Sequence, residues 1–229
     1  MTKTELQYLI ALTLVDGVGP IIGKELLHFF GSAENIFRES PTALRALKNV
    51  GPALAESVQQ KKSLSKAAAE LEFIEANDIT VISITESHYP ANLKNCVDAP
   101  IVLYYKGNGK LNEQRSVSIV GTRDCTHYGR KFVEELIEIL SEQEIAVHSG
   151  LAYGIDITAH KSSMENGIPT YCSLAHGLDR IYPHRHRGLA NKMLKMGVGL
   201  LNLCPVRYRI VKTFPKEIEL WLGFPKQLL

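Results

Sequence analysis

Residues 116–203 alternate between short apolar runs and amphipathic segments, and this alternation constrains the fold more than any other feature of the sequence. The apolar runs have the length of buried strands, and the segments between them carry apolar residues at helical spacing. The expected strands are 116–120, 145–148, 169–175 and 199–203, and the expected helices are 130–142, 156–166 and 187–196. Strands that alternate with helices in this way form a parallel sheet. We therefore predict an α/β fold with a doubly wound, mostly parallel sheet that is covered by helices on both faces.

Residues 1–60 predict a different, wholly helical domain. Apolar residues recur at helical spacing on both sides of two turns, Gly17-Val18-Gly19-Pro20 and Gly51-Pro52. A helix, a glycine-containing turn and a second helix form the helix-hairpin-helix pattern, whose turn amides can hold a DNA phosphate. Two ordinary helical hairpins that pack together also explain the pattern, and we favour them because neither turn precedes a dense basic stretch. Residues 61–201 then form the second domain, which opens with a helix at 61–77 and strands at 80–84 and 101–105.

The composition excludes several classes of protein. Hydrophobic residues are 45% and charged residues 22% of the chain, which is ordinary for a globular protein. No apolar run approaches the roughly 20 residues of a membrane span, and the N-terminus lacks the apolar core of a signal peptide. The four cysteines are far apart in the sequence, which argues against a zinc finger or a disulfide framework. We therefore expect a reduced, cytoplasmic protein that holds no cofactor. The net charge is only +2, so nucleic-acid binding must rest on local clusters of charge.

Two loops contain glycine where a predicted strand gives way to a helix: the first loop, residues 121–130, and the second loop, residues 149–156. Ligands of such sheets bind beyond the carboxyl ends of the strands. Glycine exposes backbone amides there, and a helix N-terminus favours an anion. The candidate phosphate-binding residues are Gly121, Thr122, Arg123, Ser149 and Gly150. Two tight turns without a ligand are an equally good interpretation, and neither loop has the G-x-G-x-x-G spacing of a dinucleotide site.

The third loop, residues 176–187, is basic and contains an aromatic residue. Five Lys or Arg and a single acidic residue, Asp179, lie within 176–199, and Tyr182 stands among them. Proteins bind single-stranded nucleic acid with cations that follow the backbone and rings that stack on the bases. Arg180, Tyr182 and Arg185 are therefore further candidates for DNA binding. A solvated loop with Tyr182 packed against Pro183 is the alternative.

Catalytic and metal-binding groups are not evident in these loops. Ser149 lies outside any G-x-S-x-G pattern, and no pair of carboxylates stands out. The histidines of the third loop lack a nearby cysteine or glutamate that would complete a metal site. Asp156, at the start of a predicted helix, is expected to cap the amides of the first turn, because a carboxylate there would repel a phosphate. These features favour a binding protein over an enzyme.

Several linked motifs resemble the DprA/Smf family of DNA-processing proteins. They are S-I-V-G-T-R at 118–123 followed by Tyr128-Gly129, S-G-L-A-Y-G-I-D at 149–156 followed by His160, and G-L-D-R-I-Y-P at 177–183. The sequence H-Y-P at 88–90 is similar to the family's lead-in, and the helical residues 1–60 match its N-terminal part. The resemblance covers about residues 1–201.

This resemblance implies an extended Rossmann-like domain that binds single-stranded DNA without catalysis. Proteins of the family shield incoming DNA during natural transformation, load the RecA recombinase onto it and form homodimers. The resemblance places Arg123, Ser149, Gly150, Arg180 and Tyr182 in the DNA pocket. Tyr153 stands where the family often has arginine, which puts one phosphate contact in doubt. The competing interpretation is an enzyme, a Rossmann-like nucleotide hydrolase that uses the same two glycine loops, although the P-G-G-x-G-T loop of such enzymes is absent here.

Residues 202–229 do not continue the motifs of the family. An acidic residue, a P-x-G-T loop and F-P-x-R-N-R are expected, whereas the chain has N-L-C-P-V-R at 202–207. Read one nucleotide earlier, with permissible codons, 202–207 can become E-F-M-P-G-T and 214–224 can become F-P-K-R-N-R-I-V-A-G-I. We therefore predict a frameshift at or just before Asn202, which would remove the family's dimer surface and impair the product. A divergent tail is the alternative, and sequencing codons 195–229 of the gene decides between them.

Overall fold

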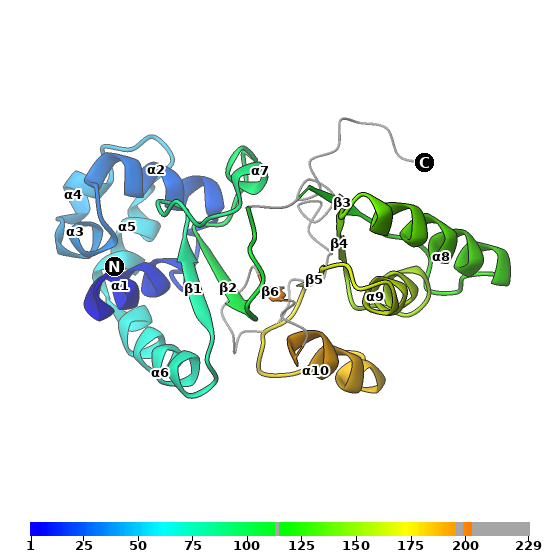
Figure 1. Cartoon of the computed structure of the whole chain (residues 1–229). Helices are drawn as coiled ribbons and strands as arrows, with labels where there is room; N and C mark the ends of the chain where they lie inside the picture. The colour runs from blue at the N-terminus through cyan, green and yellow to red at the C-terminus, as the bar shows by residue number, and fades with distance from the viewer. Residues whose placement is uncertain (113–114, 196–198, 203–229) are drawn as a thin grey trace.

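A six-stranded mixed sheet crosses the part of the protein that the computed structural model describes, which is residues 1–112, 115–195 and 199–202 (Figure 1). The strand order is β1-β2-β6-β5-β4-β3. Neighbouring strands from β3 to β6 are parallel, whereas β2 pairs with β6 and with β1 in the antiparallel direction. The strands are β1 (Thr80–Ser83), β2 (Val102–Lys106), β3 (Ser116–Ser118), β4 (Ala146–Ser149), β5 (Thr170–Leu174) and β6 (Leu200–Asn202).

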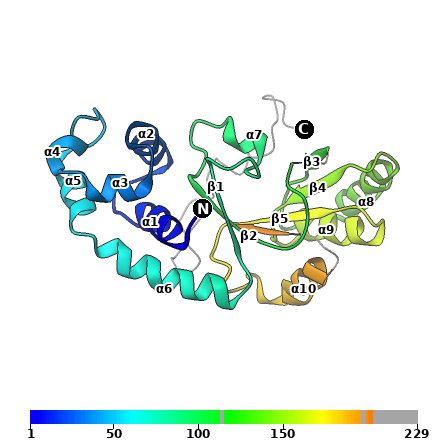
Figure 2. The same ribbon diagram turned by 60° about the vertical axis from the view of Figure 1, so that its left-hand side comes forward.

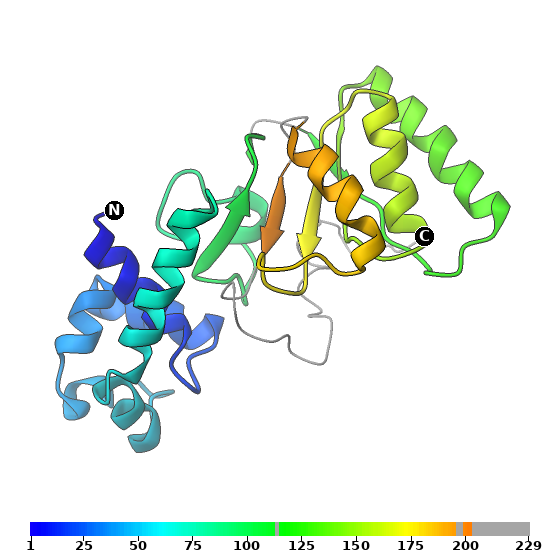
Figure 3. The ribbon, with the colours of Figure 1, turned by 90° about the horizontal axis from the view of Figure 1, so that it is seen from below.

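Helices connect the parallel strands. They are α8 (His127–Glu142) after β3, α9 (Ile155–Glu165) after β4, and the short 3₁₀ helix η1 (His184–His186) with α10 (Arg187–Lys195) after β5. Right-handed crossovers that always step in the same direction place their helices on one face of a sheet. Figure 3 shows α8, α9 and α10 along that face. The predicted α/β fold is confirmed, with a mostly parallel sheet and helices before it. The described strands β3 to β6 are neighbours in chain order, and the strand order does not reverse among them. Their connecting helices therefore lie on one face of the sheet and not on both.

The apolar pattern of α8 explains its position on the sheet. Val133, Ile137 and Leu140 are buried on one side of the helix, where they pack with Val147 of β4. The helix begins three residues before the predicted start, because the side chain of Thr126 accepts a hydrogen bond from the amide of Gly129 and caps it. β5 is buried along its whole length, as expected for a central strand of a parallel sheet.

The N-terminal part is helical, as predicted, and both Gly-Pro turns begin helices. Its helices are α1 (Lys3–Thr13), α2 (Pro20–Phe30), α3 (Ala33–Arg38), α4 (Pro41–Leu44), α5 (Pro52–Gln59) and α6 (Lys62–Ala76), and α7 (Ala91–Lys94) follows β1. Gly19 and Gly51 precede prolines at the first positions of α2 and α5. A Cβ added to Gly17 would lie 3.4 Å from a methyl group of Leu54, so the two hairpins pack together.

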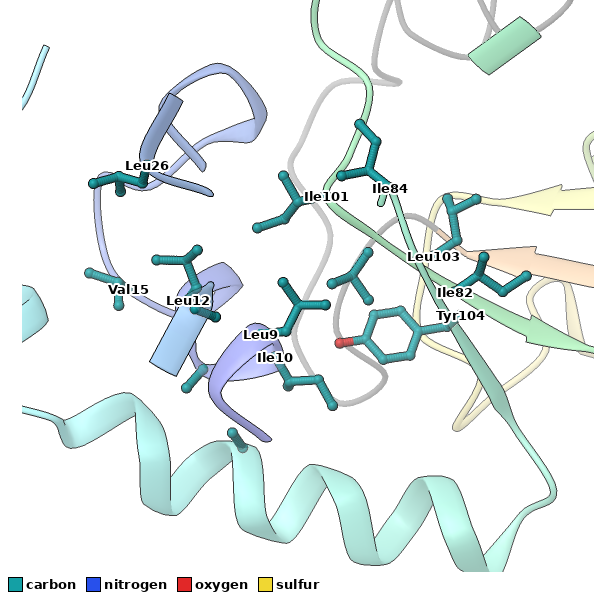
Figure 4. Close-up of a cluster of buried hydrophobic side chains, with 14 of the residues drawn as sticks. Leu9, Ile10, Leu12, Val15, Leu26, Ile82, Ile84, Ile101, Leu103 and Tyr104 are labelled. Atoms are coloured by element: carbon teal, nitrogen blue, oxygen red, sulfur yellow. The ribbon is translucent and has the colours of Figure 1, made fainter. Parts of the chain in front are cut away.

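The apolar core of the helices continues into the sheet. Leu9, Ile10 and Leu12 of α1 belong to the same buried cluster as Ile82 of β1 and Leu103 of β2 (Figure 4). Figure 2 shows α6 as a long helix that leads from the small helices to β1, and its Leu71 and Ile74 belong to this cluster. The helical part therefore shares its core with the antiparallel strands, and the domain boundary that we place at residue 60 stays a prediction.

Two further predictions concern the membrane and the end of the chain. No helix among the described residues is both long and apolar enough to cross a membrane. Residues 203–229, which make up almost all of the predicted out-of-frame tail, lie outside the described residues. The frameshift therefore stays a prediction that only the gene can test.

Candidate functional site

The first and second loops lie against each other at the carboxyl ends of β3 and β4. The backbone amide of Ile155 donates a hydrogen bond of 3.2 Å to the carbonyl oxygen of Thr122. Gly154 has a φ of +81°, and a Cβ at this position would collide with the backbone oxygens of Thr122 and Arg123. The close approach of the two loops therefore requires glycine at this position. The two candidate loops share one edge of the sheet, as the phosphate hypothesis requires.

The third loop joins this edge through His186. The Nδ1 of His186 donates a hydrogen bond of 2.7 Å to the carbonyl oxygen of Leu151 in the second loop. The ring of His186 also meets the ring of Tyr153 edge to face, with the centroids 4.8 Å apart. We had considered the histidines of this loop only as possible metal ligands. The part of the chain that the structure describes holds no group of three or more metal-ligating side chains.

The second loop turns its polar groups inward. Ser149 is buried, and its hydroxyl donates a hydrogen bond of 2.6 Å to the carbonyl oxygen of Ile119. Gly150 is also buried, and its carbonyl oxygen accepts from the Nε2 of His160 at 2.5 Å. The other ring nitrogen of His160 lies 2.7 Å from the hydroxyl of Thr170, which fixes the ring. Ser149 and Gly150 therefore hold the second loop in place through buried hydrogen bonds, and the Ser149 hydroxyl is not exposed to a ligand.

The buried carboxylate of Asp156 binds a backbone amide of the second loop. Its Oδ2 accepts a hydrogen bond of 3.3 Å from the amide of Ala152, in the loop before the helix and not in the first turn of α9. Burial raises the pKa of Asp156 above its usual value, while the Ala152 amide and the nearby Arg123 guanidinium act to lower it. A Cβ on Gly150 would lie 2.5 Å from Oδ2, so glycine makes room for this carboxylate. The structural role of Asp156 is thus tied to the loop and not to the helix cap that we expected.

The exposed side of this edge is basic and aromatic. Thr122 and Arg123 of the first loop are exposed, as are Arg180 and Arg185 of the third loop. The side chain of Tyr182 is 65% exposed, which does not agree with tight packing against Pro183. Of the eight residues that the sequence singled out, Gly121, Thr122, Arg123, Arg180, Tyr182 and Arg185 are exposed, whereas Ser149 and Gly150 are buried.

Sequence reasoning missed the supporting role of two histidines at this site. His160 and His186 hold successive carbonyl groups of the second loop, and no local pattern distinguishes such buried histidines from surface ones. Tyr153 of the second loop, which stands where the family often has arginine, is 43% exposed, and its ring meets His186 of the third loop.

Comparison with known proteins places this geometry in context. The family described as DNA recombination-mediator protein A matches residues 80–226. The match continues past Leu201, further than the motifs that carried our own resemblance. The DNA processing protein DprA of Streptococcus pneumoniae is 42% identical over 143 residues, which are 62% of this chain and 47% of that protein. The chain spans about half the length of the curated relatives that it matches.

Two solved structures share the fold. The X-ray structure of DprA from Streptococcus pneumoniae has a TM-score of 0.76 at 26% identity, over 95% of this chain and 74% of that one. DNA processing protein A from Helicobacter pylori, whose single-stranded DNA binding mode is the subject of that structure, has a TM-score of 0.51 at 24% identity. That match covers 58% of this chain and 59% of the other.

Proposed function

This chain belongs to the DNA recombination-mediator protein A family, and from that membership we propose that it binds single-stranded DNA at the carboxyl edge of its parallel strands. The observation that carries the proposal is the meeting of three loops at one edge, with Arg123, Arg180, Arg185 and Tyr182 all exposed. The Helicobacter pylori relative, which binds single-stranded DNA, supports the same ligand.

The chemistry of binding rests on side chains more than on backbone amides. Asp156 already accepts from the amide of Ala152, and its carboxylate would repel a phosphate that approached the second loop directly. Arg123 offers a planar fork of donors that suits a phosphate. Arg180 and Arg185 add charge, and the exposed ring of Tyr182 offers a surface on which a base can stack. The buried second loop then holds the first loop in place through Ile155 and Gly154.

In the cell, we propose that the whole protein processes incoming DNA during natural transformation, shields it and loads the RecA recombinase onto it. Its relatives are bacterial DNA-processing proteins. We also propose that it acts in the cytoplasm, as a homodimer and without catalysis of its own. A frameshift at Asn202 would weaken the dimer and the activity. A stable dimer of residues 1–229 with full RecA-loading activity would contradict that last expectation.

The substitution Arg123→Ala tests the proposed site. Binding of a labelled oligothymidylate is followed by fluorescence anisotropy at several salt concentrations. Loss of one phosphate contact should lower the slope of log affinity against log salt by about 0.7, and weaken binding severalfold at low salt. Arg115→Ala is the matched control, because Arg115 is also exposed. It lies just before the amino end of β3, away from the three loops, and donates a hydrogen bond to the carbonyl oxygen of Gln143.

Unchanged affinity and salt slope in Arg123→Ala would remove the first loop from the interface. Competition experiments address the enzyme alternative. A nucleoside monophosphate that displaced the oligonucleotide at a similar concentration would indicate a mononucleotide site, and we expect it to compete poorly.

A further inference from the structure

The outward face of α10 is basic along its whole length. Arg187, Lys192 and Lys195 are exposed on this helix, with Gly188 and Asn191 between them. Ala190 and Met193 lie on the opposite side, where they are buried against β5 and β6. We call the three exposed cations the α10 stripe. No Asp or Glu occurs anywhere in residues 180–195.

Some cations on other helices are paired with carboxylates, whereas those of the α10 stripe are not. Lys131 of α8 lies 3.6 Å from Glu135, and Arg38 of α3 lies 2.6 Å from Glu34, each one helical turn away. Such pairs are the usual arrangement of a solvated helix face. Within the described ranges, no ion pair reaches Arg187, Lys192 or Lys195, so their charges are available to an anion.

The stripe begins at the proposed DNA site and leads away from it. α10 follows the third loop directly, and His186, its neighbour, is bonded to Leu151 of the second loop. Because β5 and β6 are parallel, the helix between them runs from the carboxyl edge back toward the amino edge (Figure 3). From Arg187 to Lys195 it rises about 12 Å. A stacked single strand at about 3.4 Å per nucleotide would cover this length with three or four nucleotides.

We propose that single-stranded DNA bound at the three loops continues along α10, with phosphates on Arg187, Lys192 and Lys195. This inference rests on the proposed function and extends it by assigning a path. A linear polyanion suits a series of unpaired cations spread along the exposed side of α10, which directly follows the loop that carries Arg180 and Arg185. A membrane surface suits it poorly, because basic helices bind lipid by inserting an apolar face, and the apolar face of α10 is buried.

Oligonucleotide length separates the stripe from the loops. Affinities of the full chain are measured for an oligothymidylate of about six nucleotides and for one of about twenty. The double variant Lys192→Gln/Lys195→Gln should bind the longer strand about tenfold more weakly, with a salt slope smaller by about 1.4, and the shorter strand almost normally. Arg123→Ala should weaken both. Lys48→Gln/Lys62→Gln, which removes the same charge from exposed lysines of the helical part, should weaken neither.

Three results would overturn the path. They are unchanged binding of the longer strand by Lys192→Gln/Lys195→Gln, an equal loss on both strands, or the same loss in the control variant. In each case, weakened binding by Arg123→Ala would leave the loop site standing. If the unaltered chain bound neither strand, the proposed function would fail, and the path would fail with it.

Discussion

The first and second loops look alike in the sequence and differ in the structure. Each joins a predicted apolar strand to a helix through glycine, and each offers a hydroxyl. In the folded chain, Thr122 and Arg123 of the first loop face solvent, while Ser149 and Gly150 of the second are buried. We therefore propose that the first loop contacts the ligand and that the buried residues of the second loop mainly hold the first loop in place. Substitutions in each loop can separate these two roles.

Gly154→Ala should have the largest effect on stability, because it disrupts the contact between the first and second loops. A methyl group would collide with the backbone of Thr122 and Arg123, and the φ of +81° is unfavourable for alanine. We expect a loss of about 3 kcal/mol or more in the free energy of unfolding, measured in urea, together with weaker DNA binding. Gly167→Ala is the matched control, since Gly167 has a φ of +72° but nothing within 4 Å. It should cost only about 1 kcal/mol. Equal losses in the two variants would mean that the loops do not need their close contact.

Acid should destabilise the second loop, which rests on the buried ring of His160, before it affects the exposed first loop. Burial lowers the pKa of His160 to about 4, and His186 adds to this effect. Burial likewise lowers the pKa of the neighbouring His148 to about 4. At pH above about 6.5, these rings are neutral in both the folded and the unfolded chain, so their titration does not change the free energy of unfolding. As the pH falls from about 6.5 to about 4, only the unfolded chain takes up the protons, and stability falls. His160 alone accounts for up to about 3 kcal/mol of that loss.

The variant His160→Gln should flatten this pH dependence by one proton, measured as the slope of unfolding free energy against pH. His184→Gln, at an exposed position of η1, should leave the slope unchanged. A slope that His160→Gln did not alter would show that the second loop does not depend on the neutral ring.

Ser149→Ala and Thr122→Val each remove one hydroxyl, from the second and the first loop respectively, and should have the smallest effects. Removal of the Ser149 hydroxyl deprives the carbonyl of Ile119 of a buried hydrogen bond and should cost about 1–2 kcal/mol of stability, with an unchanged salt slope of DNA binding. Thr122→Val keeps the shape of an exposed side chain. It should leave stability within about 0.5 kcal/mol and lower DNA affinity about twofold to fivefold, which is the size of one hydrogen bond. The reversed pattern would exchange the roles of the two loops.

Much of the fold could be predicted because its signals are local. The strands at 101–105, 145–148 and 169–175 coincide with β2, β4 and β5 to within a residue or two, since an apolar run of strand length needs no information from elsewhere. The short helices α3, α4, α7 and η1 were not assigned individually. They carry too few residues for a period to be read, and packing against the shared core stabilises them.

The residue types at the site were also visible in the sequence, because glycines, arginines and a tyrosine follow the ends of the predicted strands. The alternation of apolar runs determined an α/β sheet of parallel strands, and parallel strands end at one edge, where the sequence placed the three loops. Only the tertiary structure decided which loop faces outward, because burial depends on partners distant in the chain. Ile119, His160 and His186 bond the polar groups of the second loop from within the protein, and no local pattern identifies them as its partners.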